Sequence, residues 1–353
     1  MVSFSDVALS PVAINKFFHT VLSGWVLGAG FVVGVSSWFL FRKSNVVFAK
    51  DSMKIASWVG LVGIILTMWT GDGSAVEVSK VQPMKLAAME GLYNGSNGQG
   101  LVGFGILDPS KERADGRNPM LFEIEIPKGL SLLAKHDLNA FVPGINDLID
   151  GIELDANGDT VRTVSYYERI ERGMAAQQAL RDYDAASKAG DTAAMADAES
   201  RLKADFQYFG YGYLSTPDEA VPPVAITFYA FRVMVICGGY FLLFFLVMLF
   251  LSYRKPEHLE NRWVLFFGIL TIPLVWLASE AGWVVAEVGR QPWVIEGLLP
   301  TRAAVSSISA GSVQLTFWLF AIVFAGLLTA EISILCKEIK KASKRDILAD
   351  DKH

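Results

Sequence analysis

The sequence predicts an all-α protein: a polytopic membrane helical bundle of five transmembrane helices with a long extracytoplasmic loop domain. Hydrophobic residues make up 52% of the 353 residues, and the mean hydropathy is +0.37, which is too apolar for an ordinary soluble globule. These residues gather into runs of roughly the 20 residues that cross a bilayer. One long polar segment interrupts the runs, and it predicts a substantial region outside the membrane.

Five apolar runs are predicted to span the membrane, and the polar segment Gly71–Pro223 separates the second from the third. That segment is too long for a tight connection, so we expect an extramembrane domain or ordered loop there. The runs are Phe17–Phe41, Ile55–Thr70, Val224–Ser252, Trp263–Ala286 and Val313–Cys336. The predicted organisation is helices one and two in residues 1–71, the loop in 72–223, helices three to five in 224–336, and a cytoplasmic tail in 337–353.

Composition excludes several classes of protein. The net charge of −5 gives no basic patch of the kind that binds nucleic acid. Cys237 and Cys336 are the two cysteines, and they form no CxxC motif. Neither a zinc site nor a disulfide scaffold is therefore predicted.

Basic residues predict the orientation of the chain. They follow the first, third and fifth runs, and positive charge marks the cytoplasmic side of a membrane protein. The N-terminus, the long loop and the connection Gly289–Ser312 are then extracytoplasmic, and the C-terminus is cytoplasmic. The residues concerned are Arg42, Lys43, Lys50 and Lys54, then Arg254, Lys255 and Arg262, then Lys337, Lys340, Lys341, Lys344 and Arg345.

Three segments of the loop have sequence patterns that predict secondary structure. Lys80–Tyr93 predicts a helix with Pro83 near its start. Tyr166–Phe206 predicts an amphipathic helical hairpin broken near Gly190-Asp191. Leu121–Ile126 alternates and predicts a short strand.

The third run opens with Phe228-Tyr229-Ala230-Phe231-Arg232-Val233-Met234. An arginine at this depth is costly unless it pairs or lies at the interface. The thioether of Met234 can ligate haem iron, and a large bound group could meet both Met234 and Arg232 although the two do not share a helix face. The alternative is a packed or lipid-facing methionine beside an arginine that reaches the headgroups.

His19 is the matching candidate on the first run. It lies near the extracytoplasmic end, at a depth similar to that of Met234, which suits a six-coordinate His/Met haem. Glycines follow it, and they allow a helix or a flat macrocycle to approach closely. The alternative is an interfacial histidine with glycines that only pack helices; the glycines are Gly24, Gly28, Gly30 and Gly34.

Glu280 and Glu287 lie two turns apart on one face of the fourth run. A carboxylate in hydrocarbon must be protonated, paired or bound to a metal. An interfacial pair of Glu287 with Arg290 is the alternative for the second glutamate. For Glu280, which we expect to be buried more deeply, a purely structural role is harder to defend.

These motifs resemble subunit I of the cytochrome bd quinol oxidases, the terminal oxidases of bacterial respiratory chains. The resemblance covers essentially the whole chain, and four motifs carry it in the order of the family. They are Lys16-Phe17-Phe18-His19-Thr20, Gln82-Pro83-Met84-Lys85-Leu86-Ala87-Ala88-Met89-Glu90-Gly91, Phe231-Arg232-Val233-Met234 and Gly289-Arg290-Gln291-Pro292-Trp293.

The resemblance implies a set of haem ligands. His19 and Met234 would be the axial ligands of a low-spin haem b, with Arg232 as its electrostatic partner. Glu287 matches the glutamate ligand of a high-spin haem b, and Arg290 would meet haem propionates. Haem d, the third cofactor of the family, has its ligands largely on helices that this chain lacks.

The resemblance also implies a quinol site in the loop. Lys85 and Glu90 match the quinol-site residues of the family. Their chemistry suits that role, since a lysine can hold a quinol oxygen and a carboxylate can take up a proton. Electrons would pass through the b haems to haem d, where oxygen is reduced to water. A proton gradient would arise without a dedicated pump.

One departure from the family concerns length. Subunit I has nine spans in the family, and this sequence matches the last five, so we expect an incomplete oxidase that is a fragment or one product of a split gene. The implied partners are oxidase subunit II, a small accessory subunit, the missing N-terminal helices, quinol and membrane lipid. The implied location is the bacterial cytoplasmic (inner) membrane, crossed several times.

Two competing functions stay open. A membrane carrier could bind a charged solute at Glu280, Glu287 and Arg232, although the sequence has no inverted repeat and has a large one-sided loop. An inactive truncated remnant is the other possibility.

Overall fold

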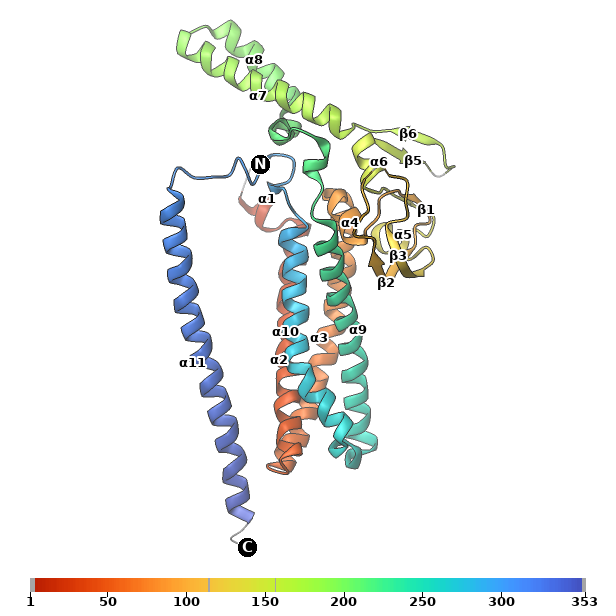
Figure 1. Ribbon diagram of the computed structural model, residues 1–353, viewed down its shortest axis with the longest axis vertical. Coiled ribbons are helices and arrows are strands. Elements are labelled where there is room, and N and C mark those ends of the chain that lie inside the picture. Colours follow the sequence, from red (N-terminus) through yellow and green to blue (C-terminus); the bar gives the residue numbers. More distant parts are fainter. Residues whose placement is uncertain (1–3, 114, 156, 351–353) are drawn as a thin grey trace. The chain divides into compact units, whose positions relative to one another are not determined.

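The structure, a computed structural model, describes residues 4–113, 115–155 and 157–350 (Figure 1). The chain divides into two compact units, each assembled from three separate stretches. The first unit holds residues 1–17, 69–236 and 279–305, and the second holds 18–68, 237–278 and 306–353. Five helices are long and apolar enough to cross a membrane, so the protein is membrane-integral and mostly helical, as predicted.

The five long helices extend beyond the predicted apolar runs at one or both ends. They are α2 (Pro11–Phe41), α3 (Val46–Val81), α9 (Val224–Arg254), α10 (Arg262–Val288) and α11 (Ala310–Asp350). The extension is largest for α3, predicted over Ile55–Thr70. It ends one residue before Gln82, which precedes a proline and is therefore biased away from helical geometry. The predicted cytoplasmic tail begins as a continuation of α11.

In the second unit, small residues let the helices approach closely. A Cβ at Gly30 or Gly34 of α2 would clash with Val275 or Ile272 of α10, respectively. Gly24 and Gly28, by contrast, have open space around them. The glycines of α2 therefore separate into a packed pair and an open pair.

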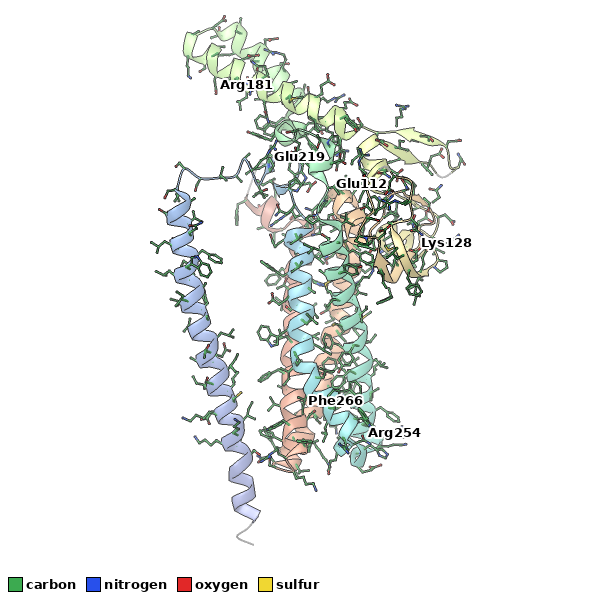
Figure 2. The ribbon with its side chains drawn as sticks, viewed as in Figure 1. Glu112, Lys128, Arg181, Glu219, Arg254 and Phe266 are labelled. Atoms are coloured by element: carbon green, nitrogen blue, oxygen red, sulfur yellow. The ribbon has the colours of Figure 1, made fainter. Side chains whose placement is uncertain are left out.

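Polar contacts tie the second unit together near the turns between helices. Ser44 bonds to Ser343 at 2.9 Å, and the Trp58 indole donates to the Tyr253 hydroxyl at 3.1 Å. Arg254, the last residue of α9, is labelled in Figure 2. In the apolar, membrane-spanning part of α11, no residue is buried against the other described residues.

The first unit contains the loop-side ends of the long helices and the segments between them. Its shorter helices are α1 (Phe4–Ala8), α4 (Pro83–Glu90), α5 (Gly129–Lys135), α6 (Ile145–Asp150), α7 (Tyr166–Ala189) and α8 (Thr192–Asp205), with 3₁₀ helices η1 (Phe206–Tyr213) and η2 (Pro217–Ala220). Its strands are β1 (Ser96–Asn97), β2 (Leu101–Leu107), β3 (Met120–Ile126), β4 (Phe141–Val142), β5 (Ile152–Leu154), β6 (Thr160–Arg162), β7 (Trp293–Ile295) and β8 (Leu299–Pro300). The strands form four two-stranded antiparallel ladders, β1–β4, β2–β3, β5–β6 and β7–β8.

The predictions for the loop are largely confirmed. The strand at Leu121–Ile126 is β3, and the hairpin breaks at Gly190 between α7 and α8 as expected. The helix predicted over Lys80–Tyr93 is wrong at both ends, since Lys80 still belongs to α3 and α4 stops at Glu90.

A buried aromatic cluster holds the first unit around α4. Tyr211 of η1 lies between Tyr166 and Trp293, with ring centroids 5.4 and 4.9 Å away. Met84 and Ala87 of α4 belong to the same core. At the edge of the unit Arg302 donates to Glu219 at 3.0 Å, the latter labelled in Figure 2.

Candidate functional site

The short helix α4 carries both residues predicted for the loop site. It starts after Gln82 and ends at Gly91, whose φ of 63° lies in the left-handed region that favours glycine. Every residue from the second position of α4 to its end is buried. Lys85 and Glu90 are therefore fixed inside the unit, not displayed on a mobile loop surface.

Lys85 is buried against the loop-side end of α10. Its Nζ donates to the carbonyl oxygen of Ala286 at 3.3 Å, and its Cε packs where Gly289 has no side chain. Burial lowers the pKa of Lys85 to about 8, and the positive charges of Lys16 and Arg290 act in the same direction. A lysine with this pKa can exchange protons with a bound hydroxyl near neutral pH.

Glu90 forms a buried ion pair with Arg232 of α9. The guanidinium Nη2 lies 2.6 Å from Oε2 of Glu90, and only 6% and 2% of the two side chains are exposed. Nη1 also donates to the carbonyl oxygen of Met89 at 3.4 Å. The family resemblance assigned Glu90 to a quinol site and Arg232 to a haem. In the structure these two side chains are in direct contact.

The surroundings of Arg232 leave room for one more hydrogen-bond acceptor at its guanidinium group. Its guanidinium lies over the ring of Phe228, 4.4 Å from the centroid. Its Nε is buried and has no hydrogen-bond partner among the described residues. The same holds for Nε of Arg290. A buried donor without a partner costs about 1–3 kcal/mol, so each arginine has an unmet hydrogen bond that an anionic group could accept.

The two predicted axial ligands lie in different units. Met234 belongs to the first, where a Cβ at Gly282 of α10 would lie 3.0 Å from its Sδ. His19 belongs to the second, and its imidazole is hydrogen-bonded to the backbone of Thr67 on α3. Such a bond orients the ring, as is typical of metal-ligating histidines. Coordination of one iron by both side chains stays a prediction.

Glu287 and Arg290 form an ion pair at the end of α10. Their side chains are 42% and 35% exposed, so the carboxylate lies at the surface of the described chain. The predicted interfacial pair is therefore present. Iron ligation by Glu287 and propionate binding by Arg290 stay predictions.

The residues present fit a haem in their donor chemistry. An imidazole with one side hydrogen-bonded, a thioether against a bare glycine and two arginines with an unmet Nε are what axial ligation and propionate binding require. Within the described residues no three His, Cys, Asp or Glu side chains gather as a metal site. Haem ligation takes one or two protein donors, so that finding leaves the haem prediction as it was.

The side chain of Glu280 on α10 is exposed among the described residues. We expected Glu280 to lie deeper in the membrane than Glu287, and this depth stays a prediction.

Glu296 is a residue that the sequence did not reveal. It lies in the turn between β7 and β8, and Gln82 donates to its Oε2 at 3.4 Å. Burial raises the pKa of Glu296 to about 7. The sequence signal that could have identified Glu296 is its position three residues after Trp293, where it is the single acidic residue of an apolar hairpin.

Comparisons with known proteins agree on one family. The family model described as cytochrome bd terminal oxidase subunit I matches residues 1–343. The chain is 35% identical to "Cytochrome bd-II ubiquinol oxidase subunit 1" of Escherichia coli K12, over 96% of this chain and 64% of that protein. It is 29% identical to "Cytochrome bd ubiquinol oxidase subunit 1" of Bacillus subtilis 168, over 98% of this chain and 60% of that protein.

A solved structure shows the same fold. The bd oxidase from Geobacillus thermodenitrificans aligns with a TM-score of 0.68 at 22% identity, over 96% of this chain and 60% of that one. The chain therefore spans 60–64% of the length of these relatives. The expectation that four N-terminal helices are missing is not confirmed by these matches and stays a prediction.

Proposed function

Because the chain belongs to the cytochrome bd terminal oxidase subunit I family, we propose that it is the quinol-oxidising, haem b-bearing part of an oxygen-reducing membrane complex. The observation that carries this proposal is the buried contact between Glu90 and Arg232. It connects the helix of the predicted quinol residues to the helix of the predicted haem ligand Met234. Electrons leaving a quinol beside α4 would thus have a short route to an acceptor held by α9.

The haem ligands of the proposal are those that the sequence indicates. His19 and Met234 would hold a low-spin haem b, Glu287 would hold a high-spin haem b, and the buried Nε–H groups of Arg232 and Arg290 would donate to propionates. When bound, these haems would act as one-electron carriers. The polypeptide contributes orientation and charge: Arg232 balances both Glu90 and a propionate in a site with little water.

Lys85 and Glu90 have different roles at the quinol site. Lys85 holds a quinol oxygen, and its pKa of about 8 lets it exchange protons with that oxygen. Glu90 supports the site through Arg232, and it can take up a proton when the charge of the arginine is shared with another anion. The oxidised product is a quinone.

The remaining parts of the proposal concern the assembly. The complex includes oxidase subunit II and a small accessory subunit in the cytoplasmic membrane, and haem d reduces oxygen to water. The loop faces the exterior, where quinol protons are released, while protons for water come from the cytoplasm. The opposite faces of uptake and release generate a potential without a pump.

A reduced-minus-oxidised spectrum of membranes that contain the protein tests the proposal. We expect a b-type band that His19→Ala and Met234→Ala each abolish. The matched controls are His136→Ala and Met174→Ala, because both are partly exposed side chains outside the predicted haem region. A wild-type protein without any haem band would contradict the proposal and favour a carrier or an inactive remnant.

A further inference from the structure

The hairpin that carries Glu296 is rigidly held. The amide of Leu298 donates to the carbonyl of Ile295 at 3.0 Å and closes the turn. Gly297 has a φ of 68°, which only glycine adopts at low cost. Its carbonyl accepts a 2.9 Å hydrogen bond from the amide of Gly210 in η1. The Glu296 side chain therefore projects from a fixed backbone.

Glu296 lines a cavity of about 140 Å³ in the first unit. Cavities of about 150 Å³ accept a benzene ring, so the volume suits the ring of one quinol. The wall combines apolar contacts for a ring with polar groups for its hydroxyls. It is formed by Val12, Asn15, Lys16, Ser74, Glu77, Val78, Val81, Gln82 and Glu296.

Charged and titratable groups surround Glu296 from several elements. The amide of Gln82 reaches one carboxylate oxygen, and the cations of Lys85 on α4 and Arg169 on α7 act on its charge. The hydroxyls of Tyr166 and Tyr211 are within electrostatic reach. Lys16 of α2 and Glu77 of α3 line the same cavity.

Burial outweighs the nearby cations and raises the pKa of Glu296 to about 7. Burial lowers the pKa of Lys85 to about 8. Two neighbouring groups, an acid and a base, are thereby brought into the range in which general acid–base groups operate.

Glu90, the carboxylate that the sequence predicted for proton uptake, is placed differently. It does not line this cavity, and both of its oxygens contact Arg232, at 3.5 and 2.6 Å. A carboxylate so engaged holds the guanidinium in place. The carboxylate that borders the cavity is Glu296.

We propose that Glu296 accepts a proton from a quinol bound in this cavity, with Gln82, which also lines the cavity, orienting a quinol hydroxyl. The inference rests on the proposed function, which supplies the electron acceptor. In the step one hydroxyl O–H bond of the quinol breaks, its proton passes to a carboxylate oxygen of Glu296, and one electron would pass to the acceptor that the proposed function supplies. Glu296 then releases this proton to water and accepts the proton of the second hydroxyl in the same way, while the second electron would follow to the same acceptor and leave the quinone.

Quinol oxidation by the native complex, followed from pH 5.5 to 8.5, tests the assignment. We expect the wild-type kcat to rise as pH passes about 7, because the ionised carboxylate is the proton acceptor. Glu296→Gln should lower kcat on the order of 100-fold, a typical contribution of one acid–base group, and should remove this titration. The reduced haem b band should be unchanged, and Glu296→Asp, which keeps a carboxyl group, should restore part of the rate and the titration.

Glu219→Gln is the matched control, since Glu219 is a carboxylate of the same unit that pairs with Arg302 at 3.0 Å and does not line the cavity. We expect it to keep the wild-type rate and pH profile. A Glu296→Gln enzyme that retains a titration near pH 7 and a rate within twofold of the control would overturn the role of Glu296, while quinol oxidation itself would stand. A wild-type complex with no quinol oxidation at all would instead contradict the proposed function.

Discussion

The ion pair of Arg232 with Glu90 shows what single residues contribute. The two are 142 positions apart, so no local pattern could predict their contact, and a family resemblance assigns them to different cofactors. A buried pair of this kind is a weak source of net stability, yet loss of one member costs about 3–5 kcal/mol because the other charge stays buried. The pair therefore contributes little net stability, and we expect its main effect to be the connection of α4 with α9.

Glu90→Gln should therefore behave differently from Lys85→Met. The first leaves Arg232 without its counter-ion two residues before Met234, so we expect a loss of about 3–5 kcal/mol in unfolding free energy and a shifted low-spin haem band. The second removes a buried charge whose Nζ donates to the carbonyl oxygen of Ala286. It should lower quinol oxidation while the haem band stays near the wild-type value and the melting temperature does not fall.

Thermal melts and reduced spectra of both variants check this expectation. Arg232→Met with Glu90→Met is the control, because it removes both charges and should recover part of the stability. An identical, haem-neutral effect of Glu90→Gln and Lys85→Met would show that the ion pair does not connect the two sites.

The lowered pKa of Lys85 also predicts a pH dependence of stability. Below about pH 8 the side chain is charged in both the folded and the unfolded chain, so its burial cost is fully present. Between about 8 and the ordinary value of 10.5 the folded protein has released a proton that the unfolded chain still binds. Stability relative to Lys85→Met should therefore rise with pH in this range. Denaturation at pH 7.5, 8.5 and 9.5 measures it, and a constant difference would contradict it.

At the scale of elements, the sequence predicts best where local chemistry decides. The hairpin of α7 and α8 is an example: Ser165 accepts a hydrogen bond from the amide of Glu168, Gly190 closes α7 in the left-handed region, and Asp191 caps α8. The strand β3 is visible because its residues alternate. Its partner β2 contains two glycines among seven residues, and two- or three-residue strands leave no periodicity to detect.

The glycines of α2 offer a test of helix packing within one element. Gly34→Ala should destabilise the protein by about 1–3 kcal/mol, as overpacking does, because its Cβ would meet Ile272 and the carbonyl of Gly268. Gly28→Ala on the same helix has open space and should be neutral or gain up to about 1 kcal/mol in helix propensity. Melting temperatures of the two variants in detergent decide it. Equal losses would show that the open face is covered in the assembled protein.

At the scale of the whole chain, hydropathy and the contacts between residues divide the sequence in different ways. Hydropathy predicts contiguous blocks, with the loop at 72–223 between two sets of helices. The compact units instead change near residues 17, 68, 236 and 278, inside α2, α3, α9 and α10. The reason is that each of these helices packs one end with the loop segments and the rest with other helices. Lys85, Glu90, Arg232 and Glu296 of the candidate site belong to the first unit, whereas His19 belongs to the second. Both units are assembled from separate stretches, so the site residues come from distant parts of the sequence.

The orientation of the chain is a prediction that a single labelling experiment can decide. Three groups of basic residues predict that α11 ends in the cytoplasm and that the α7–α8 hairpin is outside. In a background with Cys237 and Cys336 replaced by serine, Lys188→Cys near the hairpin break and Lys340→Cys beyond the last apolar run provide two exposed positions. A membrane-impermeant maleimide added to intact cells should label Lys188→Cys only, and added to inside-out vesicles should label Lys340→Cys only. The reverse pattern would place the loop, and with it Lys85 and Glu296, on the cytoplasmic face, where quinol oxidation would release its protons on the wrong side to build a gradient.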